Sequence, residues 1–112
     1  RLVVVLGHTG CGAINATIEQ LKRPVEMQSR NLPAIVDRVR PSVEPLLATP
    51  LRDDPQALVG NAVRANGRAS VTNLRHGSEI LEQLIEGDGL LVVGAEYSLE
   101  TGVVEFFEGL PE

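Results

Sequence analysis

The chain has 112 residues, of which 43% are apolar and 22% charged, a balance typical of a folded globular protein. The net charge of −5 argues against a nucleic-acid partner, which favours a basic surface. The single cysteine excludes an internal disulfide framework and fits a reducing compartment or a metal site. No signal peptide is visible, and no apolar stretch approaches the ~20 residues of a membrane span. We therefore expect a cytoplasmic protein with no membrane partner.

The chain begins at Arg1 and passes at once into the apolar, β-branched run Leu2–Leu6. Such a run is typical of a parallel strand covered on both faces. Natural domains rarely begin inside their most hydrophobic strand. We therefore expect that a substantial segment precedes Arg1 in the parent protein.

A glycine-rich turn, Gly7–Gly12, follows this strand. Cys11 or Gly12 is expected to open a helix that runs to about Lys22, because apolar residues recur on one helical face. Pro24 ends this helix.

The middle of the chain is rich in proline. Val25–Asn31 is expected to be a polar loop, and Leu32–Val39 a helix with Pro33 in its first turn. Three more prolines are expected to break the following segment into short helical turns: Pro41, Pro45 and Pro50.

A long helix is predicted next. Asp53 or Asp54 is a candidate N-cap, with Pro55 at the first helical position. The helical spacing of apolar residues continues to about Arg75.

The remaining elements are a short helix and two strands. Ser78 is expected to cap the helix, which ends at Gly87. Leu90–Val93 is a second apolar strand, and Val103–Phe107 returns after a turn in which Gly102 needs a positive φ. The close spacing of these last two strands predicts an antiparallel hairpin.

The order strand, helices, strand, strand predicts an α/β fold with a mixed, mainly parallel sheet flanked by helices. A right-handed crossover makes Leu2–Leu6 parallel to Leu90–Val93. Three strands form a thin sheet for this many helices, which again predicts missing strands. We therefore interpret residues 1–112 as a single partial domain without its N-terminal part.

The stretch "GHTGCG" between the first strand and the first helix has four physical interpretations. A phosphate cradle would use the backbone N–H groups at the helix start, but neither phosphate-binding glycine pattern is present. A reactive thiol at Cys11 would gain from the helix dipole, but no arginine follows to hold an oxyanion. A purely structural turn with a packed cysteine needs no ligand at all.

Metal ligation is the fourth interpretation. His8 leaves the strand end and Cys11 stands where the helix begins, so a spacing of three lets an imidazole nitrogen and a thiolate approach one Zn²⁺ ion. Two ligands cannot close a tetrahedral site. The other histidine, His76, lies beyond the far end of the long helix, where a dipole interaction or simple exposure is expected.

Two stretches resemble the β-class carbonic anhydrases. "VVVLGHTGCGAINA" resembles the second zinc motif of that family, a strand followed by G-H-x-x-C-G-A. "NAVRANGRASVTNLRHGSEILEQLIEGDGLLVVGAEYSLETGVVEFF" resembles the family's C-terminal part, with a strand of the form V-x-G-A-x-Y-x-L-x-T-G-x-V. The chain therefore resembles the C-terminal portion of a β-class carbonic anhydrase.

The resemblance implies a zinc lyase that reversibly hydrates carbon dioxide to bicarbonate. His8 and Cys11 match the family's histidine and second cysteine ligands, and Gly12 matches the glycine whose backbone N–H lies near the bound anion. The first cysteine ligand and an aspartate–arginine dyad come from a C-x-D-x-R motif that this sequence lacks. It therefore holds no catalytic residue of the dyad.

We therefore expect that the parent protein is an active carbonic anhydrase and that the 112-residue chain alone is inactive. The family implies a homodimer or a higher homo-oligomer. The alternative is a carbonic-anhydrase-like domain without zinc catalysis, retained for binding or assembly.

Overall fold

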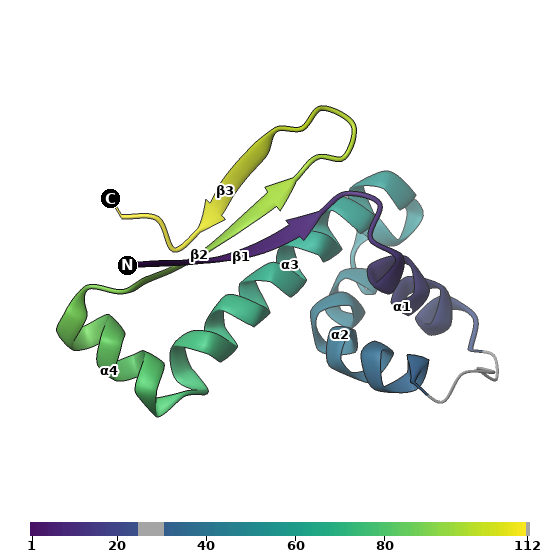
Figure 1. The fold of residues 1–112 in the computed structure, drawn as a ribbon. Helices are drawn as coiled ribbons and strands as arrows, with labels where there is room; N and C mark the ends of the chain where they lie inside the picture. The colour runs from purple at the N-terminus through teal and green to yellow at the C-terminus, as the bar shows by residue number, and fades with distance from the viewer. Residues whose placement is uncertain (25–30, 112) are drawn as a thin grey trace. The chain divides into compact units, whose positions relative to one another are not determined.

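The computed structural model describes residues 1–24 and 31–111. The polar loop predicted at Val25–Asn31 lies outside the described residues except for Asn31. The elements follow one another in chain order (Figure 1): β1 (Leu2–His8), α1 (Gly12–Lys22), α2 (Leu32–Leu47), the 3₁₀ helix η1 (Pro50–Asp53), α3 (Pro55–His76), α4 (Glu79–Asp88), β2 (Leu91–Tyr97) and β3 (Val104–Glu108).

The three strands form one mixed sheet in the order β1-β2-β3. β1 runs parallel to β2, from the pair Leu2 and Leu91 to the pair His8 and Tyr97. β2 and β3 are antiparallel, with an irregularity at Gly94/Ala95. The predicted α/β class, the parallel first pair and the C-terminal hairpin are confirmed.

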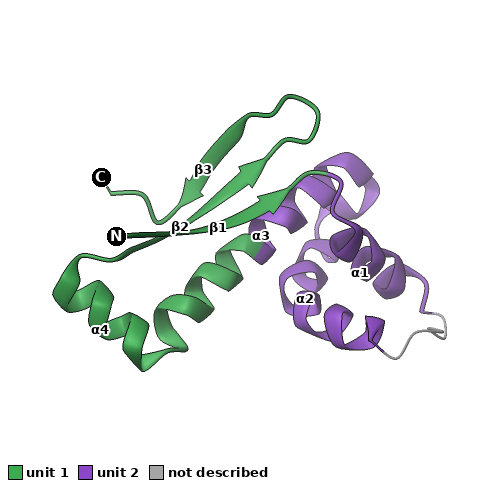
Figure 2. Ribbon diagram, viewed as in Figure 1, with its two compact units in different colours: residues 1–9, 67–112 green, residues 10–66 purple. Residues whose placement is uncertain are grey.

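The chain divides into two compact units, shown in separate colours in Figure 2. The first unit comprises residues 1–9 and 67–112, which include the sheet, the second part of α3 and α4. The second unit comprises residues 10–66, which include α1, α2, η1 and the first part of α3.

In the first unit, one face of the sheet packs against helices. Val3 and Val5 of β1 and Val92 of β2 point to this face because register partners in a parallel pair share a side. They contact side chains of α3 and α4, and the full cluster is Val3, Val5, Val71, Leu74, Leu81, Leu84, Ile85, Leu90 and Val92.

The opposite face of the sheet carries exposed apolar side chains. Leu2, Val4 and Leu6 are 60%, 39% and 54% exposed. By register, Leu91, Val104 and Phe106 share this side and are also exposed, whereas Val93 and Ala95 of the central strand share it and are buried. We call the six exposed residues the open face. Within the described residues, the helices of this unit pack on one side of the sheet only, so the predicted cover on both faces of the first strand is not present there.

The second unit has its own core. It is formed where α1, α2 and the start of α3 meet, and its buried members are Ile14, Ile18, Val39, Val43, Leu47, Leu58, Ala62 and Val63. Thr17 is fully buried, and its hydroxyl is satisfied by donating to the carbonyl of Ala13 at 2.8 Å. The apolar face predicted for the first helix is thus its packing face.

Helix α2 corrects the predicted middle segment. It continues from Leu32 to Leu47 through both Pro41 and Pro45, where short broken turns were expected. The two prolines stand four residues apart on the exposed side, so the carbonyl groups that lose a backbone donor face water. On the other side a buried stripe that includes Val43 holds the helix to the core.

The predicted helix caps are present. The Asp54 carboxylate accepts from the Ala57 N–H at 3.2 Å, and the Ser78 hydroxyl accepts from the Leu81 N–H at 3.3 Å. Helix α4 ends at Asp88 and not at Gly87, because Gly89 supplies the left-handed residue with φ of 67°.

The strand ends also differ from the predicted ones. β1 extends to His8, so Gly7 belongs to the strand and not to the turn. β2 covers Leu91–Tyr97 and β3 covers Val104–Glu108, shifted by one residue from its predicted start. Gly102 has φ of 77°, as the turn chemistry predicts.

Pro41→Ala should raise the free energy of unfolding of the protein by about 1–3 kcal/mol, because it restores a helix donor and removes the ring's clash with the preceding turn. Urea unfolding measures this change. Pro33→Ala is the matched control, because Pro33 lies in the first turn of α2, where its missing N–H costs no hydrogen bond. Equal effects of the two substitutions would contradict this account of α2.

Candidate functional site

The site predicted from the sequence begins at the end of β1. His8 is the last residue of the strand and is exposed. Its register partner is Tyr97, the last residue of β2, so the two parallel strands end at the same level. Ligands of α/β proteins commonly bind beyond the carboxyl ends of parallel strands, which is where His8 stands.

The residue after His8 is anchored twice. The Thr9 N–H donates to the Tyr97 carbonyl at 3.0 Å, which continues the ladder one residue past the strand. The Leu99 N–H donates to the Thr9 hydroxyl at 2.9 Å. These bonds hold the end of β1 against the turn between β2 and β3.

The hydrogen bond of the His8 ring defines which of its nitrogens carries the proton. Its Nδ1 lies 2.7 Å from the Thr9 carbonyl oxygen. A carbonyl oxygen only accepts, so this bond requires the proton on Nδ1 and leaves the lone pair of the neutral ring on Nε2. A histidine that binds metal through one nitrogen usually donates from the other in this way.

A tight turn leads from the strand into helix α1. Gly10 has φ of 65°, a conformation that residues other than glycine seldom adopt. Cys11 is the N-cap of α1, and Gly12 is its first residue. The Cys11 thiol is free and half-buried, and its side chain packs against the core of the second unit.

Glycine at position 12 is not required by local geometry. Its φ is not positive, and a Cβ added there meets no atom within 4 Å. Neither backbone conformation nor crowding therefore requires glycine at position 12, and the space that a Cβ would enter at the start of α1 is open to a small ligand.

A third metal donor is absent from the described residues. Residues 1–24 and 31–111 contain no group of three His, Cys, Asp or Glu side chains that could hold a metal ion. His76 lies at the end of α3 with its side chain 72% exposed, 3.7 Å from the Glu82 carboxylate. This is the exposed position at a helix C-terminus that the sequence predicts, away from the His8 motif in the chain.

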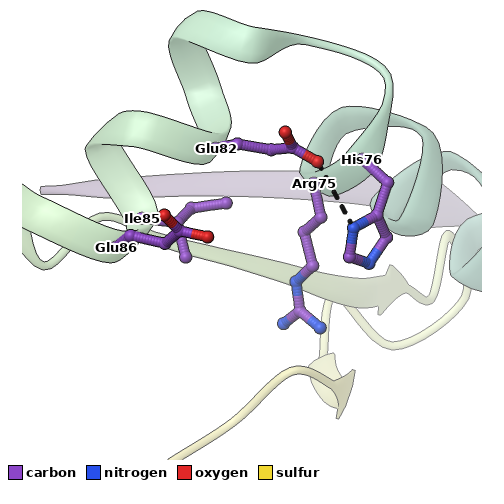
Figure 3. Close-up of a pocket in the computed structure, with 5 residues that line it drawn as sticks. All are labelled: Arg75, His76, Glu82, Ile85 and Glu86. Atoms are coloured by element: carbon purple, nitrogen blue, oxygen red, sulfur yellow. Dashed lines mark ion pairs between the residues drawn. The ribbon is translucent and has the colours of Figure 1, made fainter.

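A pocket surrounds His76 (Figure 3). It is lined by Arg75, His76, Glu82, Ile85 and Glu86, from α3 and α4. Arg75 turns its guanidinium away from both carboxylates, and its Nη2 donates to the Val92 carbonyl at 2.8 Å. The cation therefore ties the helix to the sheet, and the pocket contains none of the predicted site residues.

Sequence reasoning missed Thr9. A threonine directly after a strand that ends at a candidate ligand is the one available signal, because its hydroxyl can bond to a neighbouring loop. The partner in that bond, Leu99, is 90 residues away along the chain. Such a contact depends on strand register, which a single sequence does not reveal.

Comparison with known proteins decides the family. The family model described as "Carbonic anhydrase" matches residues 1–104. The chain belongs to the carbonic anhydrase family. The resemblance noted on the G-H-x-x-C-G-A stretch is thereby confirmed.

Two carbonic anhydrases of known sequence are similar to this chain. Carbonic anhydrase 2 of Mycobacterium tuberculosis is 33% identical over 101 residues, which cover 90% of this chain and 46% of that protein. The carbonic anhydrase of Mycolicibacterium smegmatis is 34% identical over 104 residues, covering 93% of this chain and 48% of that protein. The chain thus spans about half the length of these relatives.

Solved structures place the fold in the β class of carbonic anhydrases. A tetrameric β-carbonic anhydrase from Sordaria macrospora superposes with a TM-score of 0.78 at 18% identity, covering 95% of this chain and 51% of that one. The β-carbonic anhydrase CcaA superposes with a TM-score of 0.71 at 21% identity, covering 97% of this chain and 52% of that one. The chain therefore has part of the β-carbonic anhydrase fold.

No helix in the described parts of the chain combines the length and the apolar character that a membrane span requires.

Proposed function

We propose that this chain forms part of a zinc-dependent enzyme that reversibly hydrates carbon dioxide to bicarbonate. One observation carries the proposal. A chain that matches the carbonic anhydrase model has a histidine, with Nε2 left for a ligand, at the carboxyl end of β1, and a free thiol at the start of α1 three residues later.

His8 and Cys11 are the proposed zinc ligands, through Nε2 and the thiolate sulfur. The donor set fits, because borderline-soft Zn²⁺ accepts imidazole and thiolate together. The bond from His8 Nδ1 to the Thr9 carbonyl presents the correct nitrogen. Bound zinc would act as a Lewis acid that lowers the pKa of a coordinated water.

Gly12 is proposed to bind the anion. It is the first residue of α1, so its backbone N–H has no partner within the helix and lies at the positive end of the helix dipole. The absence of a Cβ keeps the approach to this N–H open. A bicarbonate oxygen is a suitable acceptor for it.

The remaining parts of the site are proposed to lie outside this sequence. The family's C-x-D-x-R motif supplies a further cysteine ligand and the aspartate–arginine dyad, and Cys11 is the sole cysteine here. We therefore propose that residues 1–112 form a partial domain, and that this chain alone is inactive. A thiolate ligand of this kind favours a reducing compartment, which supports a cytoplasmic location.

A homo-oligomer is proposed for the parent protein. Sheets with parallel strands are usually covered on both faces, and the open face of this sheet carries Leu2, Val4 and Leu6 exposed. Within the described residues, β1 also has a neighbouring strand on one side only. The Sordaria macrospora relative is described as tetrameric, which supports assembly of copies as a way to cover such surfaces.

One observation favours a second, non-catalytic function. The described residues supply two metal donors at the motif and no third, which is compatible with a carbonic-anhydrase-like domain that binds or assembles without zinc. The sequence preceding Arg1 in the gene discriminates between the two, because the enzyme needs C-x-D-x-R there.

The enzyme proposal is tested by His8→Ala in the full-length protein. Wild-type protein should contain about one zinc per chain by elemental analysis and should hydrate carbon dioxide. His8→Ala should lose the zinc and return the hydration rate to the uncatalysed one, because a ligand is removed. His76→Gln is the matched control and should change neither quantity, since that side chain is 72% exposed and paired with a surface carboxylate.

Metal-free wild-type protein with a native fold and no hydration activity would favour the non-catalytic domain. Loss of zinc in His76→Gln would instead assign His76 as a ligand and contradict the ligand set proposed here.

Gly12→Ala tests the anion site. The added methyl group meets no protein atom, so the free energy of unfolding should stay equal or rise by up to about 1 kcal/mol. The KM for bicarbonate should rise several-fold, because the methyl group crowds the approach to the N–H. Gly60→Ala in α3 has the same open surroundings and should leave KM unchanged. An unchanged KM in Gly12→Ala would remove Gly12 from the site.

The 112-residue chain on its own should self-associate, because the open face is apolar. Size-exclusion chromatography should show species larger than the 12.0 kDa monomer. Leu6→Lys should weaken this association, whereas Ile80→Lys, at an even more exposed apolar residue on α4, should not. A well-folded and purely monomeric wild-type chain would contradict the proposal that the open face binds other copies of the chain.

A further inference from the structure

We infer that Thr9 is a positioning residue that holds the His8 ring with its Nε2 free for a metal ion. The inference rests on the proposed zinc site. It assigns a task to a side chain that touches neither zinc nor substrate, and it is carried by three hydrogen bonds of the structure.

The first step is that Thr9 is fixed on two sides. Its N–H donates to the Tyr97 carbonyl at 3.0 Å, and its hydroxyl accepts from the Leu99 N–H at 2.9 Å. One bond holds the backbone before the Thr9 Cα and the other holds the side chain. The direction of the Thr9 carbonyl then depends on a single remaining torsion, ψ.

The second step is that the anchoring loop is itself well bonded. Within the turn between β2 and β3, the Ser98 hydroxyl accepts from the Thr101 N–H, and the Thr101 hydroxyl accepts from the Val103 N–H, both at 3.2 Å. The Ser98 N–H also donates to the Val103 carbonyl at 2.9 Å. Leu99 therefore donates to Thr9 from an ordered turn.

The third step is the consequence for His8. The Thr9 carbonyl accepts from His8 Nδ1 at 2.7 Å, so its direction selects the tautomer and limits ring rotation. Without this acceptor, an exposed imidazole would share its proton between both nitrogens, and part of the population would present a protonated Nε2 that cannot bind zinc. Groups that orient a metal ligand in this way typically contribute about 10–100-fold to metal affinity.

The hydroxyl is the part of Thr9 that matters. Serine keeps an oxygen that can accept from the Leu99 N–H, whereas valine keeps the shape and removes the acceptor. Thr9→Ser and Thr9→Val therefore separate the hydrogen bond from side-chain packing. Thr101→Val is a matched control, because it removes another hydroxyl acceptor of the same turn but no bond to Thr9 or His8, and the turn keeps its bonds to Ser98.

Zinc affinity of the full-length protein, measured by competition with a chelator, is the first readout. Thr9→Val should bind zinc about tenfold more weakly than wild type, whereas Thr9→Ser and Thr101→Val should stay within about threefold. Wild-type affinity in Thr9→Val would overturn the inference, and so would equal losses in Thr9→Ser and Thr9→Val.

The His8 ring of the metal-free protein, observed by ¹⁵N NMR, is the second readout. Wild type should show the Nδ1-protonated tautomer, and Thr9→Val should shift the population toward Nε2 protonation. This measurement needs no zinc, so it separates the two ideas. Wild-type protein that binds no zinc would end the zinc proposal, whereas an unshifted tautomer in Thr9→Val would end the inference about Thr9.

Discussion

The parallel pairing of β1 with β2 is the interaction on which the rest of the structure depends. It joins residues about 90 positions apart, and its register brings the ends of both strands to one level. The ladder extends by one further bond, from the Thr9 N–H to the Tyr97 carbonyl. A shift of the register by one residue would turn every β1 side chain to the other face and carry His8 away from its present side. The strand register therefore fixes the position of the candidate ligand His8 at the same time as it fixes the sheet.

The same register divides the sheet into two unlike faces. Val3 and Val5 reach the helices, whereas Leu2, Val4 and Leu6 do not. A run of five apolar residues is compatible with either one-sided or two-sided burial, because composition alone does not say how many layers surround a strand. The number of layers is set by whatever else packs on the sheet. For this reason an alternating burial pattern arises from a sequence that does not alternate.

The reliability of the sequence-based predictions follows the range of the interactions involved. The caps at Asp54 and Ser78 and the turn glycine Gly102 were predicted correctly, because each acts within one turn of backbone. Pro41 and Pro45 were wrongly expected to break α2. Their cost of about 3 kcal/mol each is a local figure, and packing of the opposite face of the helix outweighs it. Rules based on neighbouring residues fail where packing against a core formed by distant residues decides whether a helix continues.

The candidate site shows the same division between local and distant information. His8, Cys11 and Gly12 stand within five residues, so their spacing alone suggested zinc chemistry and left three other interpretations open. Family membership favours the metal-site interpretation, but it does not describe how the proposed ligand His8 is held. That information comes from the hydrogen bonds of Thr9, which reach Leu99 through the fold. A short motif therefore suggests the donor atoms, and the bonds that we propose orient the His8 ring combine a contact to its neighbour Thr9 with contacts that Thr9 makes across the fold.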